Sequence, residues 1–136
     1  MENDVLVSIG KENYTTQIQY GNLSLLADEP TELGGANQGF APTQLLLSSI
    51  GSCKAITMKM YANRKKWEIQ NIDIKLSLET KKSDLQQTTF IKCNIFISGN
   101  LADDQKQRLY NIAEKCPIQK ILQNPIVIES NLITTK

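Results

Sequence analysis

One stretch of the sequence constrains the fold more than any other, the run PTQLLLSSIGSCKAITMKMYANRKK from Pro42 to Lys66. In a helix, its apolar side chains would lie almost all round the axis for much of its length: Leu45, Leu46, Leu47, Ile50, Ala55, Ile56, Met58 and Met60. Proline suits the first turn of a helix, and the basic residues at the end of the run favour the helix macrodipole. We therefore predict one long helix without a solvent face over most of its length, running through a core or an interface.

Length and charge limit the kinds of protein that this chain can be. The 136 residues predict a single domain over 1–136, large enough for one hydrophobic core. The net charge of +1 argues against nucleic acid or an acidic membrane as a partner. No apolar run approaches the roughly 20 residues of a membrane span. Glu2 and Asp4 stand where a secretion signal carries positive charge, so we expect a cytoplasmic protein.

The side chains that carry chemistry are three cysteines and no histidine. In a reducing compartment, cysteines are not expected to form a structural disulfide framework, and any bridge is expected to be transient and catalytic. The absence of histidine excludes Ser/His and Cys/His hydrolase triads, together with every zinc or iron site that needs a histidine ligand.

The pattern of apolar residues predicts an α+β fold with antiparallel sheets, in the order βββ-α-ββ-α-(α)-β. The predicted segments are a strand over 5–9, a hairpin over 14–25, a functional loop over 27–42, the long helix, strands over 72–78 and 89–98, a helix from Asp103 or Asp104, a short helix after Pro117 and a last strand over 126–128. Because the long helix needs cover on its second side, we expect an obligate homodimer with paired central helices.

Cys53 lies in the middle of the long helix, and two interpretations of it stay open. A cysteine in an apolar helix is usually a small buried hydrophobic residue. A redox role needs a second thiol, and Cys116 is the better candidate because it lies on the apolar stripe of the predicted second helix, formed by Leu109, Ile112, Ala113 and Cys116. Cys93, in the middle of a strand, is interpreted as packing.

Two separated motifs resemble those of the OsmC/Ohr family of osmotically inducible and organic hydroperoxide resistance proteins. The first is GG-x-N-x-G-x-x-P-x-x-LLL-x-S-x-GSC-x-A-x-T-x-x-MYA-x-RK from Gly34 to Lys65, and the second is Cys116-Pro117 in the sequence EKCPI. The resemblance implies an OsmC-like intertwined homodimer, with antiparallel sheets wrapped around the long central helices.

The resemblance also implies an activity, that of a thiol peroxidase acting on small hydrophobic organic hydroperoxides. Cys53 would be the peroxidatic thiol, which becomes a sulfenic acid, and Cys116 the resolving thiol, which condenses with it to a disulfide. A dithiol reductant of unknown identity would restore both. The family uses no metal and no other cofactor. An apolar pocket beside Cys53, built from both subunits, would bind the hydroperoxide.

Some positions depart from the family's pattern. Thr43 follows Pro42, where the best-studied peroxidases carry a glutamate that pairs with an arginine from the N-terminal strand region. That arginine is missing, and Lys11 is the candidate substitute that would favour the thiolate. Gln119 stands where the OsmC-like branch often has a histidine. The departures keep two alternatives open: a thiol-disulfide or redox-sensing protein, and a non-catalytic dimeric binder of a hydrophobic ligand.

Overall fold

The computed structural model describes residues 3–134. The chain divides into two compact units, one ending at Ser49 and the other beginning at Ile50. Among the helices of the described residues, none combines the length and the apolar character that crossing a membrane requires.

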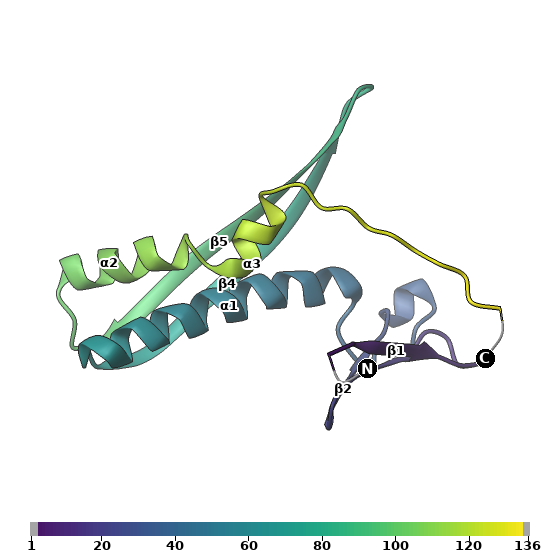
Figure 1. The fold of residues 1–136 in the computed structure, drawn as a ribbon, viewed down its shortest axis with the longest axis horizontal. Helices are drawn as coiled ribbons and strands as arrows, with labels where there is room; N and C mark the ends of the chain where they lie inside the picture. The colour runs from purple at the N-terminus through teal and green to yellow at the C-terminus, as the bar shows by residue number, and fades with distance from the viewer. Residues whose placement is uncertain (1–2, 135–136) are drawn as a thin grey trace. The chain divides into compact units, whose positions relative to one another are not determined.

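The first unit contains a three-stranded antiparallel sheet in the order β1-β2-β3, with β1 over Leu6–Ile9, β2 over Thr16–Tyr20 and β3 over Leu23–Ala27 (Figure 1). Ile18 of β2 lies opposite Val7 on one side and Leu25 on the other. The turn between β2 and β3 begins at Gly21, whose φ of 58° favours glycine. The first strand and the hairpin are therefore confirmed.

Asp28 organises the loop after β3. This residue is only 2% exposed, and its carboxylate accepts hydrogen bonds from Thr15 Oγ1 at 2.9 Å and from four backbone amides, those of Tyr14, Glu29, Ala36 and Gln38. Burial alone would raise the pKa of Asp28, but the hydrogen bonds from Glu29, Gln38, Thr15 and Ala36 outweigh it and lower the pKa to about 2. The loop, which also contains the 3-10 helix η1 over Thr31–Leu33, is thus closed around a charged side chain.

The long helix α1 runs over Pro42–Lys65, as the sequence predicts. The amide of Ala41 donates to Gln44 Oε1 at its start. At its end, Lys66 adopts a φ of 59°, and the amide of Trp67 donates to the carbonyl of Ala62 at 2.9 Å. This is the Schellman arrangement that stops a helix, with a lysine where glycine is more usual.

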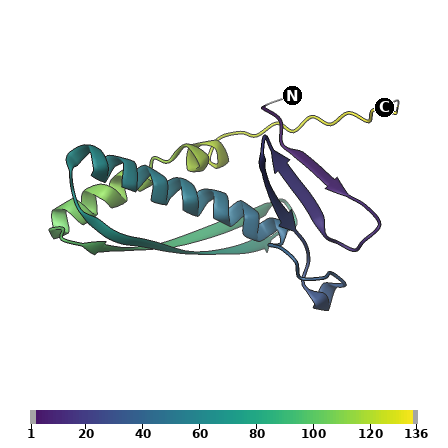
Figure 2. The same ribbon diagram turned by 90° about the horizontal axis from the view of Figure 1, so that it is seen from below.

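The second unit packs helices on one face of a long hairpin. Strands β4 over Ile69–Lys82 and β5 over Gln87–Gly99 pair antiparallel, and helix α2 over Asp103–Ala113 and helix α3 over Pro117–Leu122 follow. Figure 2 shows α1 lying along the hairpin. The core consists of buried residues from α1 and α2 against alternate positions of the strands: Met58, Tyr61, Ala62, Leu109 and Ala113 with Ile72, Ile74, Ile95 and Ile97.

Two details of the predicted order are wrong. Helix α2 ends at Ala113, so Cys116 does not belong to its stripe; Cys116 instead precedes Pro117, which suits the first turn of α3. Ile126, Val127 and Ile128 form no strand. Among the described residues no strand pairs with them, and an isolated segment has no partner for its backbone hydrogen bonds.

The central helix is covered on one side within its own unit. Met58, Tyr61 and Ala62 are buried, whereas Ile56 is 54% exposed and Met60 is 59% exposed. Apolar side chains one turn apart share a helix face, so a continuous part of α1 is uncovered in the single chain. The homodimer stays a prediction that this uncovered face supports.

Candidate thiol site

The structure brings together the thiols of Cys53 and Cys116. Cys53 projects from the middle of α1, and Cys116 occupies the corner between α2 and α3. Both are free thiols, and the side chains of Cys116 and Cys53 form a hydrogen bond. Contact between the two side chains is the first requirement for a disulfide, so the arrangement is suited to reversible oxidation.

The local structure around Cys116 keeps its thiol in place. Cys116 is fully buried, and its sulfur caps α3 by accepting a hydrogen bond from the amide of Gln119 at 3.4 Å. Burial raises the pKa of Cys116, and the hydrogen bond to Cys53 raises it further, although the Gln119 amide and the charge of Lys54 act in the opposite direction. Cys116 therefore carries its proton in the reduced protein.

A buried lysine lies beside the two thiols. Lys54 follows Cys53 on α1 and is 2% exposed. Its ammonium donates to the carbonyl of Ala113 at 3.1 Å, to Glu114 Oε2 at 3.4 Å and to Gln119 Oε1. Because an ammonium has three N–H donors, each donor has one acceptor and the charge is compensated by a carboxylate.

Glu114 connects this lysine to the end of α2. The hydroxyl of Tyr110, one turn earlier, donates to the Glu114 carboxylate and lowers the pKa of Glu114, and hydrogen bonds from Gln119 and Lys54 and the Lys54 charge add to that effect against burial. The same hydrogen bond raises the pKa of Tyr110. Glu114 is therefore a carboxylate at neutral pH and remains the counter-ion of Lys54.

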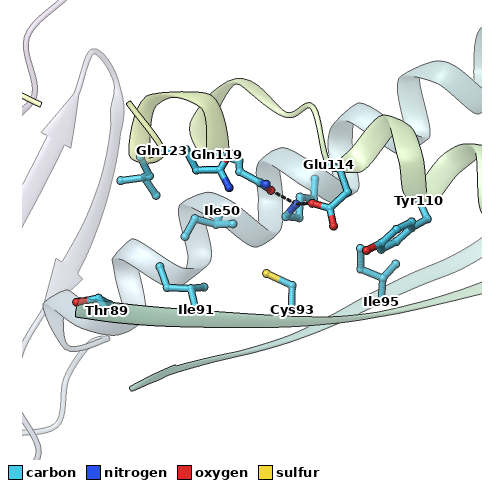
Figure 3. Close-up of a pocket in the computed structure, with 11 residues that line it drawn as sticks. Ile50, Thr89, Ile91, Cys93, Ile95, Tyr110, Glu114, Gln119 and Gln123 are labelled. Atoms are coloured by element: carbon cyan, nitrogen blue, oxygen red, sulfur yellow. Dashed lines mark hydrogen bonds and ion pairs between the residues drawn. The ribbon is translucent and has the colours of Figure 1, made fainter. Parts of the chain in front are cut away.

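Cys93 faces the same network across a cavity of about 310 Å³. Figure 3 shows its thiol pointing from β5 into this cavity, with Glu114, Gln119 and Tyr110 opposite. Burial raises the pKa of Cys93, while the Lys54 charge lowers it and the charges of Glu114 and Cys116 raise it. The cavity also has apolar walls, formed by Ile50, Ile91, Ile95 and Leu122, and neither Cys53 nor Cys116 lines it.

The two remaining residues singled out from the sequence lie in the first unit. Thr43 is exposed in the first turn of α1. Lys11 is exposed in the turn between β1 and β2. Their proposed effects on the thiol stay predictions.

Sequence reasoning missed Lys54, Glu114 and Tyr110. Lys54 interrupts the apolar face of the long helix, and a charged residue there is a signal for a buried ion pair, because an unpaired charge in a core is costly. Its partner could not be identified, since Glu114 is far away in the chain and its contact depends on how α2 packs. Within residues 3–134, no cluster of three or more histidine, cysteine, aspartate or glutamate side chains has the arrangement of a metal site.

Comparisons with known proteins agree with this fold. An OsmC-like protein from Mycoplasma pneumoniae has a TM-score of 0.73 at 19% identity, covering 90% of this chain and 88% of that one. An organic hydroperoxide resistance protein OsmC from Legionella pneumophila has a TM-score of 0.65 at 20% identity, covering 90% and 91%. No curated protein matches the sequence.

A family model decides the assignment. The model described as OsmC-like protein matches residues 35–131, which include Cys53, Cys93 and Cys116, and therefore most of the chain. The family resemblance inferred from the two cysteine motifs is confirmed, and the antiparallel α+β architecture is shared with the solved structures. The chain belongs to the OsmC-like protein family.

Proposed function

We propose that this protein is a cysteine-based peroxidase that reduces organic hydroperoxides. The observation that carries the proposal is the contact between the Cys53 and Cys116 thiols. Family membership adds support, as does the similarity to the Legionella pneumophila protein named for organic hydroperoxide resistance. The buried Lys54 beside the thiols supplies a positive charge near the site.

The proposed reaction has two steps in the protein. The Cys53 thiolate attacks the peroxide O–O bond, forming a Cys53 sulfenic acid and releasing the alcohol once the alkoxide takes up a proton. The Cys116 sulfur then attacks the Cys53 sulfur, the S–O bond breaks, and a disulfide and one water molecule form. Finally, a dithiol reductant exchanges with this disulfide and becomes oxidised itself.

Cys116 is suited to the second step. Its thiol already contacts the sulfur that it would attack, and its raised pKa keeps it protonated until the sulfenic acid has formed. The proton of the thiol can then leave with the departing hydroxyl as water. The first step thus depends on the Cys53 thiolate, and the second on the position of Cys116.

The direct test adds one equivalent of cumene hydroperoxide to the reduced protein and follows intact mass and peptide maps. We expect rapid formation of a Cys53–Cys116 disulfide, with a loss of two hydrogen atoms from the mass. A Cys93→Ser variant should behave in the same way, and a Cys53→Ser variant should consume no hydroperoxide. Thiols that stay reduced for many minutes in the wild-type protein would contradict the proposal.

The cavity beside Cys93 favours a second candidate function, the binding of a hydrophobic ligand without catalysis. Its volume of about 310 Å³ is at the lower end of the range for small-molecule sites, and it combines isoleucine and leucine walls with a few polar groups. Fluorescent fatty-acid probes test this candidate. Binding that is equal in wild type and Cys53→Ser, in a protein that does not react with hydroperoxide, would favour it.

A further inference from the structure

We propose that Lys54 is a positioning residue for the thiol pair: it fastens the corner that carries Cys116 to the helix that carries Cys53. This inference rests on the proposed function for its role in a catalytic cycle, but the geometry that it concerns is present in the reduced protein. Neither the family pattern described above nor the names of similar proteins assign a role to this lysine.

The contacts of Lys54 surround Cys116 in the sequence. Ala113 and Glu114 precede Cys116 at the end of α2, and Gln119 follows it in α3. Because Cys53 and Lys54 are neighbours on α1, the three hydrogen bonds of one ammonium tie both sides of the Cys116 corner to the helix segment that carries Cys53.

Burial restricts the groups that can compensate the charge of Lys54. At 2% exposure, Lys54 has almost no access to water, so its charge depends on Glu114 and on the two neutral acceptors. An apolar residue could fill the same space without such requirements. A cation that is held by three acceptors, two at the end of α2 and one in α3 on the other side of Cys116, therefore indicates a positioning function as well as packing.

The lysine also acts on the thiols through its charge. The titratable groups around it are Cys53 on its own helix, Cys93 on β5, Tyr110 on α2, Glu114 directly after α2, and Cys116 directly before α3. Lys54 lowers the pKa of Cys93 and of Cys116, whereas Glu114 raises that of Cys93. The two members of the ion pair thus have opposite electrostatic effects on the Cys93 thiol.

The first test measures disulfide formation without any peroxide. Full-length protein is equilibrated with oxidised and reduced glutathione, in which the two protein thiols become a disulfide as one oxidised glutathione becomes two reduced molecules. We expect the equilibrium constant for the Cys53–Cys116 disulfide to fall about tenfold in Lys54→Met, because hydrogen bonds that hold Cys116 in place are lost. Lys115→Met, which removes an exposed lysine beside Cys116, is the matched control and should leave it unchanged.

Different outcomes separate this inference from the proposed function. A wild-type protein that forms the disulfide with glutathione but not with cumene hydroperoxide would refute the peroxidase function. A lower equilibrium constant in Lys54→Met would still support the role of Lys54 in that case. An equal equilibrium constant in wild type, Lys54→Met and Lys115→Met would overturn the role of Lys54 whatever the hydroperoxide result.

The second test distinguishes a specific role from general loosening. Alkylation of Cys93 by iodoacetamide is followed against pH by peptide mapping. Lys54→Met should move the profile to higher pH and Glu114→Gln to lower pH, since the two charges act oppositely on Cys93. General loosening would move both profiles in the same direction, which would overturn the proposal. Should Lys54→Met not fold, Glu114→Gln, which removes the charged partner of Lys54, carries the glutathione test, and an equilibrium constant equal to that of the wild type is the contradicting result.

Discussion

The thiols of Cys116 and Cys53 form a hydrogen bond that joins the corner before α3 to the middle of α1. The two residues are distant in the sequence, and their contact depends on the packing of α2 beside α1, where Leu109 and Ala113 meet Met58 and Ala62. The chemistry that we propose therefore depends on the core of the second unit, and the predictions below concern both.

Replacing Cys116 by serine should separate the two steps of the proposed reaction. In Cys116→Ser, made in a Cys93→Ser background, one equivalent of cumene hydroperoxide should produce a Cys53 sulfenic acid that persists, because no resolving thiol remains. Trapping with a 1,3-dione reagent and mass spectrometry measure this product. The Cys93→Ser background protein should form the disulfide, and the reagent should label almost none of it. Extensive labelling of that protein would show that Cys116 does not react with the Cys53 sulfenic acid.

Truncation of Leu109 should destabilise the packing that brings the thiols together. Leu109 is fully buried in the core between α1 and α2, so Leu109→Ala should lower the free energy of unfolding by about 2–5 kcal/mol. Urea unfolding followed by circular dichroism measures the change. Ile121→Ala, at a position 57% exposed on α3, should change it by less than about 0.5 kcal/mol, and similar losses in both variants would contradict the described core.

Asp28→Asn should destabilise the protein near neutral pH. The asparagine carries no negative charge, and its NH2 group takes the place of one carboxylate oxygen. This NH2 group would face the N–H and O–H donors that now bind Asp28. We expect a lower melting temperature for the variant at pH 7. Glu32→Gln, in the exposed η1 helix, is the control and should melt as the wild type does.

The contribution of Asp28 to the stability of the fold should decrease as the pH falls. Its pKa is about 2 in the folded protein against an ordinary value of 3.8, so its stabilising contribution is fully present above about pH 4. The contribution is lost as the pH falls from about 4 to about 2, and the difference between wild type and Asp28→Asn should shrink over that interval. A difference that stays constant down to pH 2 would contradict the lowered pKa.

The uncovered face of α1 should bind a second subunit. Light scattering should report a mass twice that of one chain, and Ile56→Lys should shift the mass toward the monomer, because Ile56 and Met60 are exposed one turn apart on that face. Leu85→Lys, between β4 and β5 at 95% exposure, is the control and should keep the wild-type mass. A monomeric wild-type protein would refute the homodimer.

The fold could be predicted from the sequence wherever a local pattern was strong. The apolar run with Pro42 at its start predicted α1, and the alternation of Ile72, Ile74 and Leu76 predicted β4. The strand over 126–128 was wrong because a short apolar run favours a strand but cannot supply one with a partner. Cys116 was misplaced by a few residues, since the helical period continues past Ala113 while the helix itself ends there.

The sequence by itself determined the family, the order of the main elements and the identity of the two thiols, because motifs and periodicity are local properties of the chain. Only the tertiary structure decided that Cys116 contacts Cys53, and that Lys54 is buried with Glu114 and Gln119 around it. The physical reason is that a buried charge needs acceptors from elements distant in sequence, and only the packing of helices on the hairpin determines which acceptors those are.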